Sequence, residues 1–512
     1  MQSLIIGILI VVIILILTCW YWRKEGFSNV SRDRVYTADQ NSNTVSVIDP
    51  ASNKLLGRIN LGKSRFQGIL NPLYAGEINV HGLGFAPDGK HICVVSHGTH
   101  SVNIIDTATN KVVARKYVGT APHECFYTAD GKEVWVAVRG ENYLSVLDAR
   151  PEAGTPSDNI PTLREKGRVR TVPGPGMVIF SSDGKYAYAN NSFNAVFQMI
   201  DVKKRKVIKT LKNLKSKFSP FLFFSPDEKE IWLTHKDSGY ITRIKDVGNP
   251  DKIHVAETVR TGLVTNHLFP IRKGNDLFIY VAVGGEDLVK VYKAGTKGRP
   301  TTLVAQIPVA ARPHGIWSNA PRRGAEATRL YVGAENGDSV TVIEADTNKV
   351  VDVIPIGQAP QALIYVPKAV NKAHEGRGNL EDLSEPRPTN FLLYAPNRPH
   401  TPRGFVGLRT SGEVDLFTLN AFGLDPRAHY NLYLQVPPTN KYTELAQFVT
   451  NDDGMGHVRT VGPLRDVFMQ PRRWKVSIVP EDSDPSPKTT ILESRGPNTT
   501  IAIKHKKYTP EI

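Results

Sequence analysis

Four histidines of this chain recur in nearly the same setting, each just ahead of an apolar run. They stand in "VHGLGF" (80–85), "PHECF" (122–126), "NHLF" (266–269) and "RPHGIW" (312–317). Imidazole nitrogens are common metal ligands and also hydrogen-bond to anions and polar molecules. A converging group of them could therefore bind a metal, an anion or a polar small molecule. Whether the four converge depends on whether they occupy one repeated position of the fold.

A repeated unit surrounds these histidines. The stretches "NTVSVIDPASNKLLGRINLG" (43–62), "HSVNIIDTATNKVVARKYVG" (100–119) and "DSVTVIEADTNKVVDVIPIG" (338–357) each hold two alternating strands joined by a turn that contains Asn-Lys. Such alternation is typical of strands with one buried face. A further hairpin, marked by turns such as "PDG" (87–89), lies upstream. Four strands repeated at intervals of roughly 45 residues indicate the blades of a β-propeller.

The number of repeats predicts seven blades. Their innermost strands begin near residues 81, 123, 176, 220, 267, 314 and 361. The chain enters the repeats with three outer strands (35–62) and leaves them with a single inner strand, "QALIYVP" (361–367). Joining the two would complete the last blade and close the ring, which removes an open seam with exposed strand edges. We predict an all-β, seven-bladed propeller over residues 34–368 with this 3+1 closure.

These repeats resemble the YVTN family of β-propeller repeats. The resemblance is carried by stretches such as "YVGAENGDSVTVIEADTNKVV" (331–351) and covers roughly residues 34–368. It implies the propeller fold. It implies no particular activity, because the family includes enzymes, binding modules and surface proteins.

The histidines fall at the first residue of an inner strand, so we expect them to ring one mouth of the central channel. The seven positions of that ring are His81, His123, Gly176, Pro220, His267, His314 and Gln361. We predict a ligand-binding rim made of His81, His123, His267, His314 and Gln361. The alternative is a structural role, since Pro-His-Gly is common at this position in YVTN repeats and the glycine would permit close packing. His97, His100 and His235 are expected in outer hairpin loops, on the solvated surface.

No catalytic residue and no cofactor are predicted. The seven-bladed propeller of nitrous oxide reductase holds a copper cluster on channel histidines, but only four positions match here and no cupredoxin-like copper motif follows. Imidazoles on separate blades are expected to stand too far apart for a single ion, so we predict no metal. Propeller lactonases typically use channel carboxylates, and the rim offers only Glu124, beside His123. The chain lacks the G-x-S-x-G and H-E-x-x-H motifs and the Rossmann glycine fingerprint.

The N-terminal residues predict a single-pass membrane anchor. Residues 4–22 carry no charge and are long enough to cross the hydrocarbon core of a bilayer. Trp20, Tyr21 and Trp22 would lie at its interface. Residues 1–3 would form a short tail and residues 23–33 a juxtamembrane linker. Arg23 and Lys24 on the C-terminal side favour a cytosolic globular part by the positive-inside rule, with an extracellular or lumenal location as the alternative.

The residues after the propeller predict a second β domain. Residues 369–390 are polar and charged, as in a linker, and residues 391–497 contain several alternating strands. The run from "YNLYLQV" to "KVSIV" resembles the C-terminal β-sandwich of anti-sigma factors, which implies an Ig-like β-sandwich. Residues 498–512 would form a basic tail.

The net charge of +15 makes anionic partners plausible. A basic run on a predicted outermost strand would protect the strand edge from pairing or contact an anionic surface. Its residues are Lys203, Lys204, Arg205, Lys206 and Lys209. No aromatic residues interleave with them, so a nucleic-acid partner is not expected.

Together these features favour a membrane-anchored binding or interaction module. The alternatives are a propeller enzyme, lactonase-like or a metal-dependent oxidoreductase, with its site at the channel mouth, and a structural surface or virion component. The sequence does not determine the protein or small-molecule partner or the oligomeric state.

Overall fold

The computed structural model describes residues 31–62, 76–150, 162–296, 298–320, 327–372, 374–383, 389–411, 414–436, 441–462 and 475–494. The predicted anchor at 4–22 and the basic tail at 498–512 lie outside the described residues. Within those ranges the structure shows no helix that is long and apolar enough to cross a membrane.

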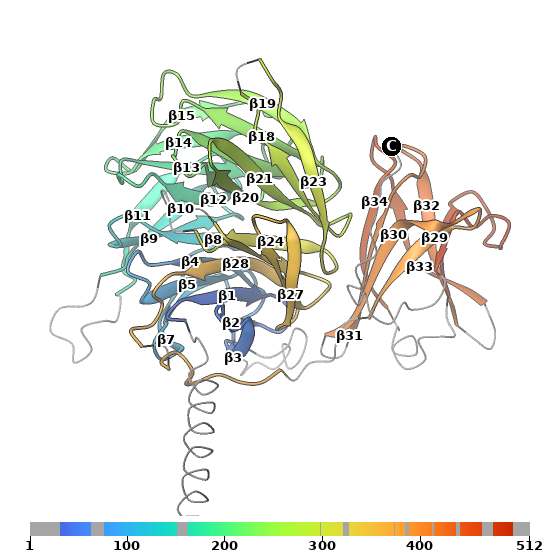
Figure 1. The fold of residues 1–512 in the computed structure, drawn as a ribbon, viewed down its shortest axis with the longest axis horizontal. Coiled ribbons are helices and arrows are strands. Elements are labelled where there is room, and N and C mark those ends of the chain that lie inside the picture. The colour runs from blue at the N-terminus through green and yellow to red at the C-terminus, as the bar shows by residue number, and fades with distance from the viewer. Residues whose placement is uncertain are drawn as a thin grey trace, which may run out of the picture.

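Seven four-stranded antiparallel sheets form the propeller, as predicted (Figure 1). The first three after the closing blade are, from the channel outward, β4 (Val80–Phe85), β5 (His91–Ser96), β6 (Ser101–Asp106) and β7 (Lys111–Tyr117); β8 (Pro122–Tyr127), β9 (Glu133–Val138), β10 (Tyr143–Asp148) and β11 (Glu165–Arg170); and β12 (Pro175–Phe180), β13 (Tyr186–Asn191), β14 (Phe197–Asp201) and β15 (Lys206–Leu211).

The next three blades repeat the same order. They are β16 (Leu222–Phe224), β17 (Glu230–His235), β18 (Tyr240–Lys245) and β19 (His254–Arg260); β20 (Thr265–Lys273), β21 (Asp276–Val283), β22 (Leu288–Lys293) and β23 (Thr302–Pro308); and β24 (Pro313–Ser318), β25 (Arg329–Ala334), β26 (Ser339–Glu344) and β27 (Lys349–Pro355). Each inner strand begins within two residues of the position predicted from the sequence.

The last blade joins the two ends of the ring. Its inner strand β28 (Pro360–Val366) pairs with β1 (Arg34–Asp39), which is followed by β2 (Thr44–Asp49) and β3 (Lys54–Asn60). The register places Tyr36 opposite Ile364. The predicted 3+1 closure is therefore confirmed.

Large side chains from the second strand of six blades fill the space between blades. An aromatic residue recurs at one register position in six blades: Tyr36, Trp135, Tyr188, Trp232, Tyr280 and Tyr331, all almost completely buried. The blade of β4 and β5 differs, because Gly84 faces Cys93 there. The second strands of the blades are therefore tightly packed, whereas outermost strands such as β7 are half exposed.

The basic run lies at the predicted outermost strand, β15 and the turn before it. Arg205 is not available to a partner in the way the other members are, because its guanidinium contacts Glu133 at 2.7 Å and donates to the carbonyl of Lys166. Contact of the remaining lysines with an anionic surface stays a prediction.

The predicted Ig-like sandwich is wrong in its topology. The C-terminal domain is a single eight-stranded sheet in the order β33-β32-β35-β36-β29-β30-β31-β34. Its strands are β29 (Thr389–Ala395), β30 (Arg398–Ser411), β31 (Val414–Ala421), β32 (His429–Val436), β33 (Lys441–Val449), β34 (Gly456–Gly462), β35 (Lys475–Pro480) and β36 (Leu492–Ser494). The edge strands β33 and β34 contact each other, so the sheet is nearly closed, like a barrel.

The physical reason is the short strand β36, which pairs with both β35 and β29. It joins two groups of strands that would otherwise form the separate halves of a sandwich. Phe417, Leu432 and Ile478 from different parts of the sheet share one buried core inside it. Alternating strands look the same in a sandwich and in a barrel, so the sequence pattern does not distinguish the two.

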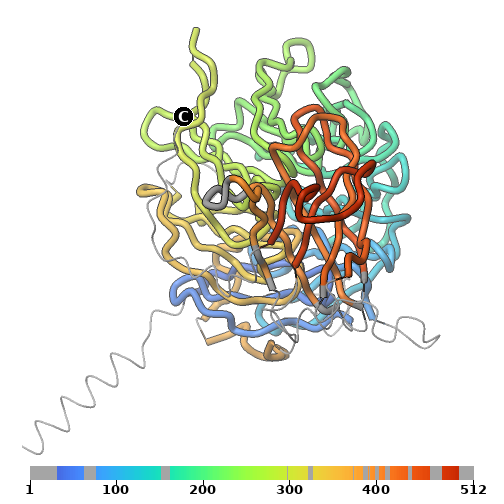
Figure 2. Tube along the Cα trace, turned by 90° about the vertical axis from the view of Figure 1, so that its right-hand side faces the viewer, coloured from blue at the N-terminus to red at the C-terminus, as the bar shows by residue number. Residues whose placement is uncertain are grey.

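The two domains lie side by side, with the C-terminal sheet against one face of the propeller ring (Figure 1; Figure 2). The strands that meet the propeller are β29, β30, β31 and β34. On the propeller, the contacts lie at the turns near the starts of the inner strands. This is the face on which the predicted histidine rim lies.

Candidate functional site

The histidine rim converges at the channel mouth. The ring centroids of His81 and His123 are 4.5 Å apart, and those of His267 and His314 are 4.9 Å apart. His81 and His314 connect the two pairs at 6.4 Å, edge to face. All four side chains are buried, and Gln361 is buried as well. The histidines therefore occupy one equivalent position in several blades, and they lie together at the mouth as the sequence predicts.

Glycines after two of the histidines allow the neighbouring inner strands to approach. A Cβ atom at Gly82 would lie only 2.2 Å from the carbonyl oxygen of His123. At Gly315 a Cβ would lie 2.9 Å from the backbone nitrogen of Leu363. Real Cβ contacts are not that short, so a side chain at either place would push the strands apart and separate the imidazoles.

Two rim histidines are oriented by the next blade. The Nδ1 atom of His123 donates to the carbonyl of Gly176 at 2.8 Å, and that of His314 donates to the carbonyl of Gln361 at 2.6 Å. Because a carbonyl oxygen only accepts, the hydrogen of each neutral ring is on Nδ1 and the lone pair is on Nε2. These bonds orient the two rings. They leave Nε2 of His123 for a ligand, whereas Nε2 of His314 faces the ammonium of Lys236.

His97 belongs to the site, and its predicted exposure is wrong. The ring stacks on that of His81 with centroids 4.0 Å apart, and the side chain is buried. The reason is the hairpin register. Ser96 at the end of β5 pairs with Val80 at the start of β4, so His97 emerges beside His81. An antiparallel hairpin always brings these ends together, and counting back from the turn would have found this residue.

The other two histidines assigned to the surface differ from each other. His235, which ends β17, is completely buried and makes a 2.8 Å hydrogen bond with Thr242, so its predicted exposure is also wrong. His100 is half-buried, and its Nδ1 accepts a hydrogen bond from the backbone of Ala121. Neither joins the rim.

His81, His97 and His123 form a compact three-histidine cluster. One ligand nitrogen from each lies within 4.8 Å of the others. Burial lowers the pKa of all three rings well below the ordinary value, and the nearby charge of Arg139 adds to this effect. The rings are therefore neutral near pH 7. His81 and His97 belong to one blade and His123 to the next, so the cluster is more compact than imidazoles that face one another across the channel.

Charged groups border the cluster and the rest of the rim. The ammonium of Lys236 lies 3.4 Å from Nε2 of His314, and burial lowers its pKa to about 8. Burial raises the pKa of Glu124 to about 8. The guanidinium of Arg139 interacts with the carboxyl of Glu124 and with all three rings of the cluster. The site therefore combines neutral imidazoles with two cations and one carboxyl group.

The C-terminal sheet covers one side of this mouth. Arg312, two residues before His314, pairs with Glu335 at 2.9 Å and contacts the ring of His457 from β34. Arg409 of β30 pairs with Asp338 at 2.7 Å. Arg312, Glu335, Arg409 and Asp338 are buried, whereas His457 is exposed. Sequence reasoning missed this docking, because the partners lie on different domains.

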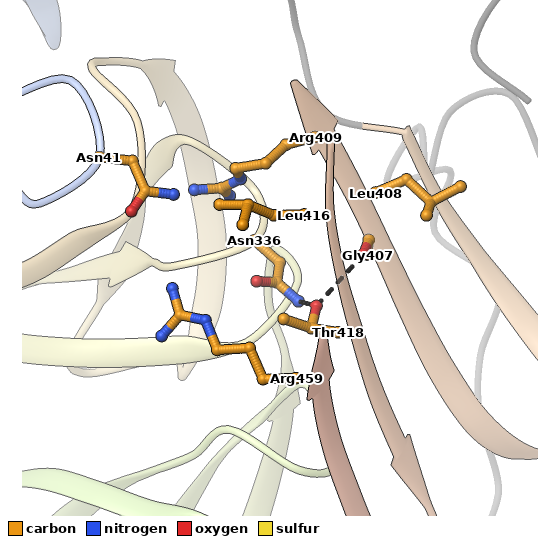
Figure 3. Close-up of a pocket in the computed structure, with 8 residues that line it drawn as sticks. All are labelled: Asn41, Asn336, Gly407, Leu408, Arg409, Leu416, Thr418 and Arg459. Carbon is orange, nitrogen blue, oxygen red and sulfur yellow. Dashed lines mark hydrogen bonds between the residues drawn. The ribbon is translucent and has the colours of Figure 1, made fainter. Parts of the chain in front are cut away.

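Figure 3 shows the junction where these contacts meet. Asn336 of the propeller donates to the hydroxyl of Thr418, which in turn donates to the carbonyl of Gly407, while Arg409 and Arg459 approach from the C-terminal strands. Arg459 lies 3.5 Å from Glu335. The junction is polar and densely hydrogen-bonded, so the two domains are held in a defined orientation.

Comparisons with known proteins agree with the fold. No family model matches the chain. Hydrazine synthase subunit beta of Kuenenia stuttgartiensis is 26% identical over 188 residues, which cover 29% of this chain and 48% of that protein. The chain thus spans about half the length of the curated relative that it matches.

Two solved structures show the same architecture. A putative 6-phosphogluconolactonase from Bacteroides fragilis is 14% identical and has a TM-score of 0.51, over 66% of this chain and 99% of that one. A functionally unknown protein from Desulfotomaculum acetoxidans is 13% identical, with a TM-score of 0.51, over 65% and 99%. The chain is a seven-bladed β-propeller that resembles the lactonase type in fold. Its sequence is similar to part of hydrazine synthase subunit beta.

Proposed function

We propose that this chain is a ligand-binding propeller whose site lies at the channel mouth, around the histidine rim and the three-histidine cluster. The observation that carries the proposal is the convergence of buried, neutral imidazoles beneath a docked second domain. Such a cluster is unusual for a purely structural surface, where histidines are solvated.

Buried polar atoms at the mouth support a polar ligand. In the described part of the chain, the Nε2 atoms of His97 and His267, Oδ1 of Asn266 and Oε1 of Glu124 have no hydrogen-bond partner. Each such atom costs about 1–3 kcal/mol when it is left unpaired. A polar ligand or ordered water among them would recover part of this free energy. An apolar ligand would not.

Binding is favoured over catalysis by the hydrogen bonds of the rim. His123 and His314 donate to backbone carbonyls, and His314 also contacts Lys236. Among the described residues, no rim histidine is hydrogen-bonded to a hydroxyl or thiol that it could activate as a nucleophile. A metal-dependent enzyme stays the alternative, because a bound ion could itself supply the chemistry.

A second candidate function follows from the similarity to hydrazine synthase subunit beta. That protein is by its name one subunit of an assembly, and a propeller with a second docked domain would suit the role of a non-catalytic subunit. Native mass spectrometry of the chain isolated from its source would test this. Recovery as a single chain under gentle conditions would contradict it.

The predicted anchor at residues 4–22 stays part of the proposal and would place the binding site near a membrane. Its support is the uncharged, apolar composition of that segment. Fractionation of the full chain and of a chain lacking residues 1–30 would test it. Recovery of both in the soluble fraction would contradict it.

A thermal-shift screen tests the binding function directly. The full chain would be titrated with divalent metals, phosphate and small carboxylates, beside His97→Ala and a control, His254→Ala, whose ring is exposed on β19. A ligand that binds only the folded state raises the melting temperature, and the shift grows with the logarithm of the ligand concentration above the dissociation constant. We expect at least one probe to stabilise the wild type and the control but not His97→Ala. Equal responses of all three proteins to every probe would contradict a site at this mouth.

A further inference from the structure

We propose that His81, His97 and His123 bind a single divalent transition-metal ion, most suitably zinc. This inference rests on the proposed function, since it names the class of ligand at the same mouth. Three imidazoles with one open position are a known donor set for zinc, and imidazole also suits copper, nickel and cobalt.

The backbone brings the three donors together from three places. His81 lies near the start of β4, His123 lies near the start of β8, and His97 directly follows the end of β5. Their ligand nitrogens already lie within 4.8 Å of one another. Two nitrogens bound to one tetrahedral zinc at about 2.0–2.1 Å stand about 3.4 Å apart. Closing the cluster on an ion therefore requires the nitrogens to approach one another by up to about 1.5 Å, a distance that side-chain rotation can supply.

Hydrogen bonding prepares at least one ring for coordination. The bond from Nδ1 of His123 to the carbonyl of Gly176 fixes the tautomer and directs the lone pair of Nε2 away from the strand. Metal-bound histidines almost always donate their other nitrogen in this way. His97 contributes a buried Nε2 atom that has no other partner in the described residues. The rings of His81 and His97 stack at 20°, which restrains both.

The other rim histidines are less suited to the ion. The ring of His267 stacks on Phe221 with centroids 4.1 Å apart, which holds it at the opposite side of the mouth. The Nε2 atom of His314 is hydrogen-bonded to the ammonium of Lys236. A cation at His314 would therefore meet a positive charge directly. The three-histidine cluster is the group that can surround an ion.

The charges around the cluster set its affinity. Arg139 interacts electrostatically with all three rings and would repel a divalent cation. The buried carboxyl of Glu124, whose pKa is raised to about 8, is mostly protonated near pH 7 and offsets little of that repulsion. Removing the guanidinium should therefore strengthen metal binding. A merely structural histidine cluster would show no such gain, so Arg139→Gln separates the two roles.

The site would have three protein ligands. The fourth position of a tetrahedral ion would be filled by water or by a ligand atom that enters the mouth. Metal binding would thus connect the propeller mouth to the recognition of a further small molecule.

The experiment uses the full chain, stripped of metal with a chelator and titrated with zinc in a calorimeter and with cobalt in a visible spectrophotometer. We expect one ion per chain and the visible d–d bands of four-coordinate cobalt. His97→Ala should weaken the affinity for zinc by more than about 10–100-fold, which is the loss expected when only an outer-sphere partner is removed. His254→Ala and His267→Asn should change the affinity for zinc by no more than about threefold. Arg139→Gln should increase that affinity about tenfold.

The outcomes distinguish the two proposals. Zinc binding that His97→Ala leaves unchanged would overturn the assignment of the ligands. Absence of zinc and cobalt binding to the wild type, together with a His97-dependent thermal shift by phosphate or a carboxylate, would overturn the metal while the binding function stands. Absence of both would overturn both proposals. Circular dichroism of each variant establishes that it folds, and the cobalt spectrum of the wild type tests the metal even where a variant does not.

Discussion

At the scale of single residues, the site depends on the glycines, which have no side chain, as much as on the histidines. Gly82 leaves room for the carbonyl of His123 and for the carboxyl of Glu124, which lies 2.6 Å from the place of a Cβ. The position after the histidine is therefore as important to the rim as the imidazole itself. The pair His-Gly is one structural unit, in which the glycine sets the distance and the histidine supplies the nitrogen.

The substitution Gly82→Ala tests this dependence. The added methyl group would meet backbone and carboxyl atoms, so we expect a loss of about 1–3 kcal/mol in the free energy of unfolding, as for other overpacked sites. Urea unfolding followed by fluorescence would measure it. The matched control is Gly378→Ala, where the structure shows open space, and there the change should stay within about 0.5 kcal/mol. Equal stabilities of the two variants would contradict the packing argument.

At the scale of elements, the closing blade determines whether the ring forms. β1 pairs with β2 on one side and with β28 on the other. β28 lies roughly 300 residues further along the sequence, so this pairing is strongly non-local. Asp39 ends β1 and is completely buried, with hydroxyl groups of Thr37, Thr44 and Ser46 donating to its carboxylate. Burial raises its pKa to about 7, against the hydrogen bonds. The closure therefore contains a titrating group.

The pH dependence of stability should report this carboxyl. Its folded pKa is raised above the unfolded value of about 3.9, so its contribution is fully present below pH ~4 and is lost as the pH rises to about 7. Asp39→Asn removes that titration. We expect the free energy of unfolding of the variant, relative to the wild type, to rise by about 2–4 kcal/mol between pH 4 and pH 7 and then to level off. Chemical unfolding at several pH values would measure the difference. A constant offset across the range would contradict the assignment.

At the scale of the whole molecule, a second domain covers the mouth of the first. The contacts between them are charged. The pairs of Arg409 with Asp338 and of Arg312 with Glu335 are buried, and the exposed Arg459 adds a further contact to Glu335. Breaking a buried pair is costly, because it leaves a charge without its partner in a poorly solvated place. The orientation of the C-terminal sheet over the histidine rim should therefore depend on a few arginines.

Replacement of Arg409 tests the docking. Arg409→Ala should cost about 3–5 kcal/mol and loosen the C-terminal sheet from the propeller. Small-angle scattering would detect the larger radius of gyration, and calorimetry would detect two separate unfolding transitions. The control is Arg427→Ala, whose exposed pair with Asp452 should be worth about 0–1 kcal/mol. An unchanged radius of gyration in Arg409→Ala would contradict a docking held by this pair.

The sequence by itself determined the seven blades, the 3+1 closure and the starts of the inner strands. These follow from alternation and turn residues, which are local and repeat along the chain, and the strand register then places His81, His123, His267 and His314 at one mouth. Only the tertiary structure decided that His97 joins them, that His235 is buried, and that the C-terminal strands form one nearly closed sheet docked on the rim. Those features arise from hairpin register and from contacts between distant segments. Such contacts depend on the summed packing of both partners, and that packing leaves no periodic signal in either segment alone.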